Sequence, residues 1–169
     1  MEKADNQEKD MSIVYDDETY ARWIYCPRYI NDSGIFKSCF ISLRDRKGYQ
    51  EEGISGQILE RVGHEQVIKN GLNFRRKTFD GTPKEERLVG YAFANCGQIR
   101  AVADERDDRI DVVLTKSVVP HHAEIRFYIE GTLVKGNNQN AHFLRYKDKL
   151  RGLLTNSCYF ANEKELAMS

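Results

Sequence analysis

Apolar and polar residues alternate most regularly between positions 122 and 129 of this chain. Ala123, Ile125, Phe127 and Ile129 occupy every second position, and polar side chains stand between them. Because successive side chains of a strand point to opposite faces, this pattern predicts a strand with one apolar and one polar face. The polar face carries His122, Glu124, Arg126 and Tyr128 in a row.

Further strands are predicted where aromatic and β-branched residues gather or alternate with polar ones. These segments are residues 20–26, 35–43, 73–79, 88–95 and 110–114, followed by a short return strand at 132–134. The turn signal Asn31-Asp32-Ser33-Gly34 suggests that the first two of these strands pair as a hairpin. The strand at 35–43 has apolar residues on both faces, which favours a central place in the sheet.

Two segments have the spacing of helices. The first runs from Ile58 to Leu72, where the pattern breaks at Gly63 and a stop signal follows at Gly71. The second covers residues 143–154, with Asn138 or Asn140 as its N-cap. The elements together predict an α+β fold, with a mostly antiparallel sheet of about five or six strands and two or more helices on one face.

Length and charge narrow the class of protein. A chain of 169 residues fits one domain, expected at residues 13–169 behind a disordered acidic tail at residues 1–12. Acidic and basic residues number 26 each, so the overall charge favours neither nucleic acid nor a membrane surface as partner. No apolar run is long enough to span a bilayer and no signal sequence is evident. We therefore expect a cytoplasmic protein.

The cysteines indicate neither a disulfide framework nor a metal site. Cys26, Cys39, Cys96 and Cys158 are scattered, with no Cys-x-x-Cys pair and no Cys/His spacing of a zinc site. We expect them to be buried free thiols, because a free cysteine behaves as a small apolar residue.

The polar strand face is the first candidate for chemistry. A carboxylate beside an imidazole raises the pKa of the imidazole and orients its ring, and a neighbouring arginine can hold an anion. The candidate catalytic residues are His121, His122, Glu124 and Arg126, together with His142 from the start of the last helix. The alternative is a solvated strand face on which Glu124 and Arg126 pair with neighbouring strands.

The order of elements around these histidines resembles the HNH nucleases. A histidine-bearing strand, a short return strand and an asparagine-rich turn precede a helix that carries a histidine, over residues 119–154. The resemblance implies a metal-dependent nuclease with His121 or His122 as the base, Asn140 as the loop residue and His142 as a ligand.

A second resemblance starts from Arg22. In ADP-ribosyltransferases an arginine on an early strand lies against the NAD phosphates, a hydroxyl and an aromatic residue follow on the next strand, and a glutamate lies on a late strand. Arg22, Ser38 with Phe40, and Glu124 occur in this order. The resemblance implies an NAD-using enzyme with Arg22 as the cofactor-binding residue. The alternative is a surface arginine beside a buried Trp23.

The stretch from Phe40 to Ser55 is similar to a segment of small uncharacterised bacterial proteins, which implies no activity. Within this stretch we expect Arg44 to pair with Glu51 or Glu52 across a loop. Bases and aromatics elsewhere could form a surface for nucleic acid. Its bases would be Arg75, Arg76, Lys77, Lys147 and Arg151.

No segment carries a motif of high specificity. The leading expectation is therefore a small bacterial accessory or regulatory protein that acts by binding a protein partner, motivated by the balanced charge, the acidic start and the basic last helix. The alternative is an enzyme with a phosphate-containing substrate, either an HNH-like nuclease or an ADP-ribosyltransferase-like protein.

Overall fold

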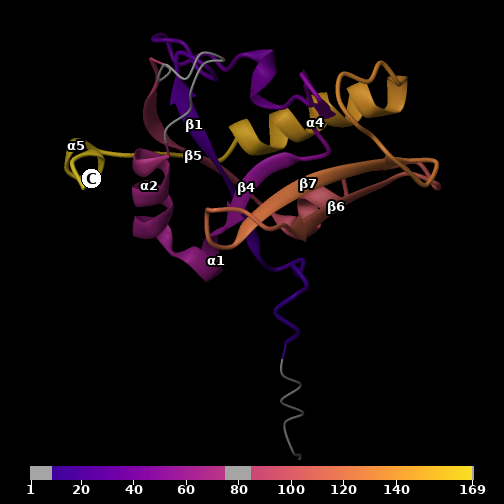
Figure 1. Ribbon diagram of the computed structural model, residues 1–169, viewed down its shortest axis with the longest axis horizontal. Coiled ribbons are helices and arrows are strands. Elements are labelled where there is room, and N and C mark those ends of the chain that lie inside the picture. Colours follow the sequence, from indigo (N-terminus) through magenta and orange to yellow (C-terminus); the bar gives the residue numbers. More distant parts are fainter. Residues whose placement is uncertain (1–8, 75–84, 169) are drawn as a thin grey trace, which may run out of the picture.

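The structure is a computed structural model that describes residues 9–74 and 85–168. Within these residues a seven-stranded antiparallel sheet has the order β6-β7-β4-β1-β5-β9, with β8 paired to β7 (Figure 1). Its strands are β1 (Thr19–Cys26), β4 (Ile54–Ile58), β5 (Arg87–Asn95), β6 (Arg109–Leu114), β7 (His122–Ile129), β8 (Thr132–Leu133) and β9 (Cys158–Phe160). The predicted α+β class with a mostly antiparallel sheet is confirmed.

The helices lie between the strands in the chain or follow the last of them. They are α1 (Leu59–Val62), α2 (His64–Asn73), α3 (Cys96–Arg100), α4 (Ala141–Thr155) and α5 (Glu163–Leu166), with a 3-10 helix at Ser38–Phe40. A separate hairpin is formed by β2 (Asp45–Arg46) and β3 (Tyr49–Gln50). None of the described helices is both long and apolar enough to cross a membrane.

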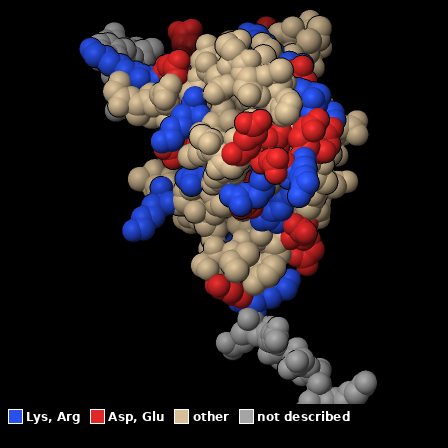
Figure 2. Space-filling view, turned by 90° about the vertical axis from the view of Figure 1, so that its right-hand side faces the viewer, with Lys and Arg blue, Asp and Glu red and all other residues tan. Residues whose placement is uncertain are grey.

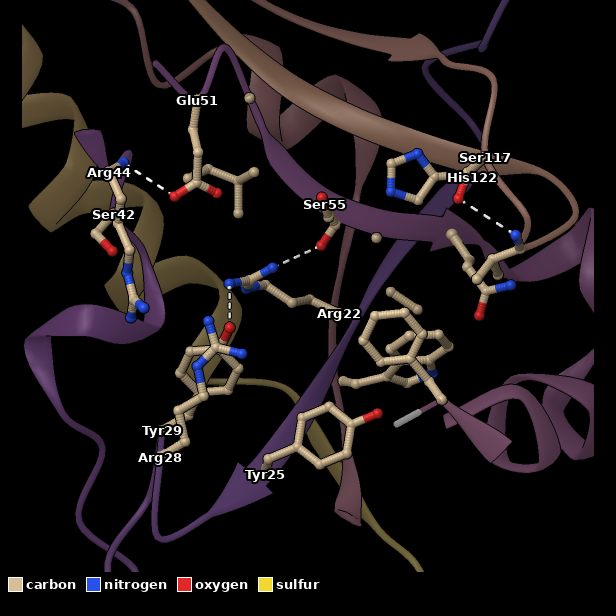
Figure 3. Close-up of a pocket in the computed structure, with 18 of the residues that line it drawn as sticks. Arg22, Tyr25, Arg28, Tyr29, Ser42, Arg44, Glu51, Ser55, Ser117 and His122 are labelled. Atoms are coloured by element: carbon tan, nitrogen blue, oxygen red, sulfur yellow. Dashed lines mark hydrogen bonds between the residues drawn. The ribbon is translucent and has the colours of Figure 1, made fainter. Parts of the chain in front are cut away.

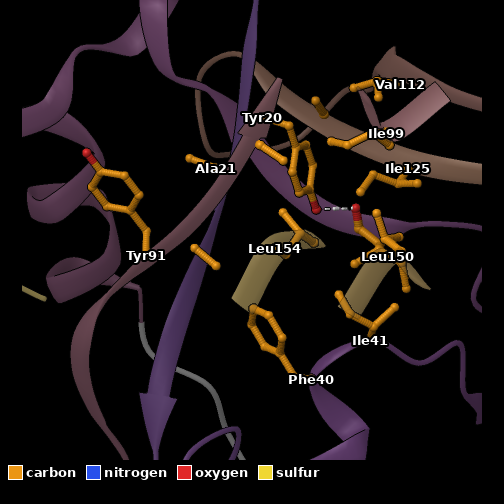
Figure 4. Packing of buried hydrophobic residues seen from close by; sticks show 14 of the residues in the cluster. Tyr20, Ala21, Phe40, Ile41, Tyr91, Ile99, Val112, Ile125, Leu150 and Leu154 are labelled. Atoms are coloured by element: carbon orange, nitrogen blue, oxygen red, sulfur yellow. Dashed lines mark hydrogen bonds between the residues drawn. The ribbon is translucent and has the colours of Figure 1, made fainter. Parts of the chain in front are cut away.

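The two largest helices pack on opposite faces of the sheet. On one face the ring of Phe127 meets Phe143 of α4 at a centroid distance of 5.0 Å, and Tyr20 lies near Leu150 and Leu154 of the same helix (Figure 4). On the other face the indole Nε1 of Trp23 donates to the carbonyl of Val67 in α2 at 3.0 Å. Both faces of the central strands are therefore covered, one by α4 and the other by α2, and these two helices are far apart in the sequence.

Two local predictions about the helices are confirmed. The segment from Ile58 to Leu72 forms two helices that break at Gly63, where φ is +90°, a conformation that a side chain disfavours. The N-cap of α4 is Asn140, whose Oδ1 accepts from the backbone N–H groups of His142 at 2.9 Å and Phe143 at 3.3 Å.

The predicted strand at residues 35–43 is wrong, and so is its hairpin with β1. Only one bridge, Ile30 to Phe36, forms there, and the 3-10 helix follows. Phe40 and Ile41 are both buried, but they form the end of this 3-10 helix and its C-cap, so packing and not strand pairing buries them. The Ser42 hydroxyl also donates to the Cys39 carbonyl at 3.1 Å, a local bond that competes with strand pairing.

The hydrophobic pattern does not predict the central strand β4, because serine, glycine and glutamine separate its two isoleucines. Its place depends on Gly56, where an added Cβ would lie 2.4 Å from Cζ of Tyr20. The hydroxyl of Tyr20, fully buried beside it, donates to the carbonyl of Ile54 at 2.7 Å. A long side chain from β1 thus reaches across β4, and only glycine leaves room for it.

Several predictions fall partly or wholly outside the described residues. These are residues 1–8 of the acidic tail, most of the strand at 73–79, and Arg75, Arg76 and Lys77. Next to the tail, the carbonyls of Met11 and Ile13 accept hydrogen bonds from Arg61. All four cysteines are free thiols; Cys26 and Cys96 are buried, whereas Cys39 and Cys158 are half-buried.

Candidate functional site

A cavity opens where β1 and β4 separate. These strands pair at only two positions, Tyr20 with Ile58 and Ala21 with Gln57. Beyond them lies a cavity of about 240 Å³, lined by the two strands, the loop after β1, the end of α2 and the loop before β7 (Figure 3). It therefore exists because two neighbouring strands stop pairing within the sheet.

Arg22 lies in the middle of this cavity and takes over part of the missing strand pairing. Its Nη1 donates to the carbonyl of Ser55 at 2.7 Å, its Nε to the carbonyl of Phe40 at 3.0 Å, and its Nη2 to the hydroxyl of Tyr29 at 3.0 Å. The guanidinium also lies 4.9 Å from the centre of the Tyr29 ring. These contacts hold the guanidinium in place, yet every acceptor is neutral.

Three more arginines line the same cavity: Arg28, Arg44 and Arg46. Arg46 forms an ion pair with Glu51 at 3.7 Å, whereas Arg28 rests on the Tyr29 ring at 4.4 Å. Among the described residues, no carboxylate lies within 4.0 Å of the guanidinium of Arg22, Arg28 or Arg44. The cavity therefore holds more positive charge than its own carboxylates neutralise.

The predicted contact between Arg44 and Glu51 forms through the backbone. The N–H of Arg44 donates to the Glu51 carboxylate at 3.0 Å, and the N–H of Glu51 donates to the Arg44 carbonyl at 3.0 Å. The guanidinium of Arg44 takes no part in this exchange. The loop is thus closed by one main-chain bond and by one bond from a main-chain N–H to the Glu51 carboxylate, and the guanidinium of Arg44 remains at the cavity.

The opposite side of the cavity is aromatic. Trp23, Tyr25 and Phe74 line it, and the rings of Trp23 and Phe74 are 5.4 Å apart at a tilt of 36°. In Figure 3, Arg28 and Arg44 lie toward one side of the cavity and His122 toward the other, with Arg22 and Ser55 between them. Trp23 follows Arg22 directly in β1, so the two side chains point to opposite faces of the strand. The site thus has a cationic end at the arginines and an aromatic end at Trp23 and Phe74.

His122 is brought to this cavity from the start of β7, where it pairs with Gln57. Its Nδ1 forms a short hydrogen bond with the hydroxyl of Thr115, and its Nε2 has no hydrogen-bond partner among the described residues. Burial lowers the pKa of the imidazole below its usual value; the charge of Arg22 acts in the same direction, and Glu124 opposes both. The ring is therefore neutral at neutral pH.

The remaining residues of the polar strand face do not line the cavity. The predicted pleat is confirmed, since Ala123, Ile125 and Phe127 are fully buried and the intervening side chains are half-exposed. Glu124 accepts from Nε of Arg126 at 3.2 Å, so the two charges pair within their own strand. His121 precedes the strand, is exposed and has φ of +52°.

His142 lies at the other end of β7 from His122. Its Nδ1 is 2.8 Å from the carboxylate of Asp108, which also accepts from the hydroxyl of Tyr146 at 2.6 Å. The Asp108 carboxylate also accepts a hydrogen bond from the backbone N–H of Glu130, the residue that follows β7. At ~3.3 Å per strand residue, the two histidines are roughly 20 Å apart, so the structure does not bring them together.

The structure brings together only part of the second resemblance. Arg22 lines the cavity and contacts Phe40, with its guanidinium 5.4 Å from the centre of the Phe40 ring and its Nε donating to the Phe40 carbonyl. Ser38 is exposed, Glu124 pairs with Arg126, and neither lines the cavity. Among the described residues, no group of three or more His, Cys, Asp and Glu side chains could hold a metal ion.

The bases of α4 lie among acids. Arg151 pairs with Asp148 at 3.3 Å, and Lys149 pairs with Asp104 at 2.8 Å, whereas Lys147 lies over the Phe143 ring. Figure 2 shows Lys and Arg side chains interleaved with Asp and Glu on one side of the molecule. A nucleic-acid partner for Lys147 and Arg151 stays a prediction.

Several cavity residues carry no signal that sequence analysis can use. Arg28, Gln57 and Phe74 belong to no motif, whereas Arg22, His122 and the stretch from Phe40 to Ser55, which supplies Arg44 and Glu51, are candidates from the sequence alone. No known protein family, no curated protein and no solved structure matches this chain. Its function has to be argued from the chemistry of the cavity.

Proposed function

We propose that this protein binds a small phosphate-bearing anion between β1 and β4, and that this binding serves an accessory or regulatory role. The observation that carries the proposal is the set of three guanidinium groups, from Arg22, Arg28 and Arg44, that share a cavity without a paired carboxylate of the described residues. Like charges in a half-buried cavity repel each other, and a bound anion removes that repulsion.

The geometry suits phosphate because the arginines are already held in place. Three hydrogen bonds fix Arg22, and the Tyr29 ring supports Arg28 from one side. A guanidinium presents its N–H donors in a planar fork that matches the oxygen atoms of a phosphate. Little side-chain freedom is then lost on binding, which favours affinity.

Calorimetric titration with inorganic phosphate and pyrophosphate, at constant ionic strength in chloride, tests the proposal. The unmodified protein should bind, and Arg28→Ala and Arg44→Ala should each weaken binding by about tenfold or more, the loss expected for a hydrogen bond to a charged group. Arg106→Ala is the matched control, because Arg106 is exposed and does not line the cavity. Absence of binding, or an equal loss in the control, would refute the proposal.

The second candidate function is an enzyme that acts on a phosphate-containing substrate. It is favoured by the neutral imidazole of His122 in the same cavity as Arg22. A neutral histidine can accept a proton from an attacking group, and an arginine stabilises charge that develops on phosphate. His122 would act as the base and Arg22 as the charge-stabilising group.

Turnover assays separate the two candidates. The protein is incubated with a phosphomonoester, with DNA or RNA in Mg²⁺ or Mn²⁺, and with NAD. Turnover that His122→Gln abolishes while phosphate binding persists supports the enzyme. Binding without turnover of any of these substrates leaves the accessory role, for which co-purification with the tagged chain tests a protein partner.

A further inference from the structure

We infer that the ligand of this cavity is a single nucleotide, with its phosphate at the arginines and its base at the aromatic end. The inference rests on the proposed phosphate binding and adds the chemical class of the ligand. A ligand that fills such a site needs an anionic group, a planar ring and a short link between them. A nucleoside 5′-monophosphate has all three.

The aromatic end provides a wall on which a base can stack. Phe74 is 38% exposed, unusually open for a phenylalanine that lines a cavity, and its ring tilts against Trp23. The orientation of the Trp23 indole is fixed by a hydrogen bond, which its Nε1 donates to the carbonyl of Val67 in α2. Stacking of a base on an aromatic side chain is worth about 1–3 kcal/mol and depends little on the identity of the base.

Gln57 places an unsatisfied acceptor at the cavity. Its side chain is only 2% exposed, its Nε2 donates to the carbonyl of Pro120 at 3.2 Å, and its Oε1 has no donor among the described residues. A buried carbonyl without a donor is destabilising. A ligand can satisfy this oxygen with any donor, and a base supplies ring N–H or amino groups for it.

The size of the cavity limits the ligand to one nucleotide. Its volume of about 240 Å³ is below the range of ~300–1,000 Å³ typical of sites for drug-sized molecules. A dinucleotide such as NAD would extend well beyond it. The arginines therefore meet one phosphate-bearing end, and the aromatic wall meets one ring.

The chain offers its own probe for this inference. Its single tryptophan is Trp23, so fluorescence excited at the red edge of the absorption band, where the tyrosines do not absorb, reports on the aromatic end alone. The full chain is titrated with the four ribonucleoside 5′-monophosphates, with ribose 5-phosphate and with adenosine, and calorimetry provides a second measurement of each affinity. We expect the mononucleotides to quench the fluorescence and to bind about tenfold more tightly than ribose 5-phosphate.

Two variants separate the ring from the phosphate. Phe74→Leu should remove most of the advantage of the mononucleotides and leave the affinity for ribose 5-phosphate unchanged. Phe160→Leu is the matched control, because Phe160 is 54% exposed on β9 and does not line the cavity. This control should bind every ligand as the unmodified protein does.

The outcomes distinguish this inference from the proposed function. Equal affinities for ribose 5-phosphate and the mononucleotides would overturn the base site and leave phosphate binding intact. Adenosine that binds as tightly as its monophosphate would overturn the two-ended site. If no phosphate-bearing ligand binds, the proposed function itself fails.

Discussion

Replacing Asp108 should destabilise the fold, because its carboxylate fastens α4 to the hairpin of β6 and β7. The Asp108 side chain is 1% exposed and accepts three hydrogen bonds. They come from the Tyr146 hydroxyl at 2.6 Å, from Nδ1 of His142 at 2.8 Å and from the Glu130 backbone N–H at 3.0 Å. One buried group thus joins three elements of the fold.

The magnitude follows from which donors can reach water once the carboxylate is gone. In Asp108→Ala the buried Tyr146 hydroxyl loses its acceptor, at a cost of about 2 kcal/mol. His142 and Glu130 are accessible to solvent, so their lost bonds add only about 1 kcal/mol together. We expect the free energy of unfolding to fall by about 3 kcal/mol in Asp108→Ala.

Urea denaturation followed by circular dichroism measures this loss. His142→Ala is the control within the network: it removes one solvent-accessible partner and should cost about 0.5 kcal/mol. The reasoning is refuted if the free energy of unfolding falls by less than about 1 kcal/mol in Asp108→Ala, or by the same amount in both variants. The buried carboxylate would then stabilise the fold no more than a solvent-accessible hydrogen bond does.

The hydrogen bonds to Asp108 also predict that the stability of the fold depends on pH. Burial raises the pKa of Asp108, but hydrogen bonds from Tyr146, the Glu130 N–H and His142 together outweigh it and leave the pKa below 3.8. Because the folded value is the lower one, the stabilisation is complete above pH 3.8 and is lost as the pH falls through the folded pKa. The difference in stability between the unmodified protein and Asp108→Asn should therefore shrink in acid.

Three further predictions concern single positions. Gly56→Ala should lower the free energy of unfolding by about 3 kcal/mol in urea denaturation, because the new Cβ would lie 2.5 Å from the carbonyl of Ala21; an unchanged midpoint contradicts this packing. Gln57→Met removes the unsatisfied Oε1 together with the Nε2 bond to the Pro120 carbonyl, so the stability of the unliganded protein should change by less than about 1 kcal/mol while mononucleotide binding weakens; unchanged binding contradicts the role of Gln57. Burial raises the pKa of Cys96 to about 12, so mass spectrometry should find this thiol unmodified by iodoacetamide at pH 8 in the folded protein and alkylated in urea.

Elements whose pattern is local are predictable from this chain. The alternation around Ile125 appears as β7, and the glycine at 63 and the asparagine at 140 mark helix boundaries. Each of these depends on side-chain direction or backbone conformation within a few residues. The segment at 35–43 shows the limit, since its apolar residues are buried by contacts with distant parts of the chain and not by strand pairing.

The candidate site shows the same division. The sequence alone determined that His122 shares a strand face with Glu124 and that Arg22 lies on an early strand. Only the tertiary structure decided that Arg22 and His122 line one cavity, that Glu124 pairs with Arg126 and does not line it, and that His142 belongs to another network. The reason is the strand order: β4 lies between β1 and β7, so the cavity is assembled from positions up to a hundred residues apart, a distance over which no periodicity in the chain carries information.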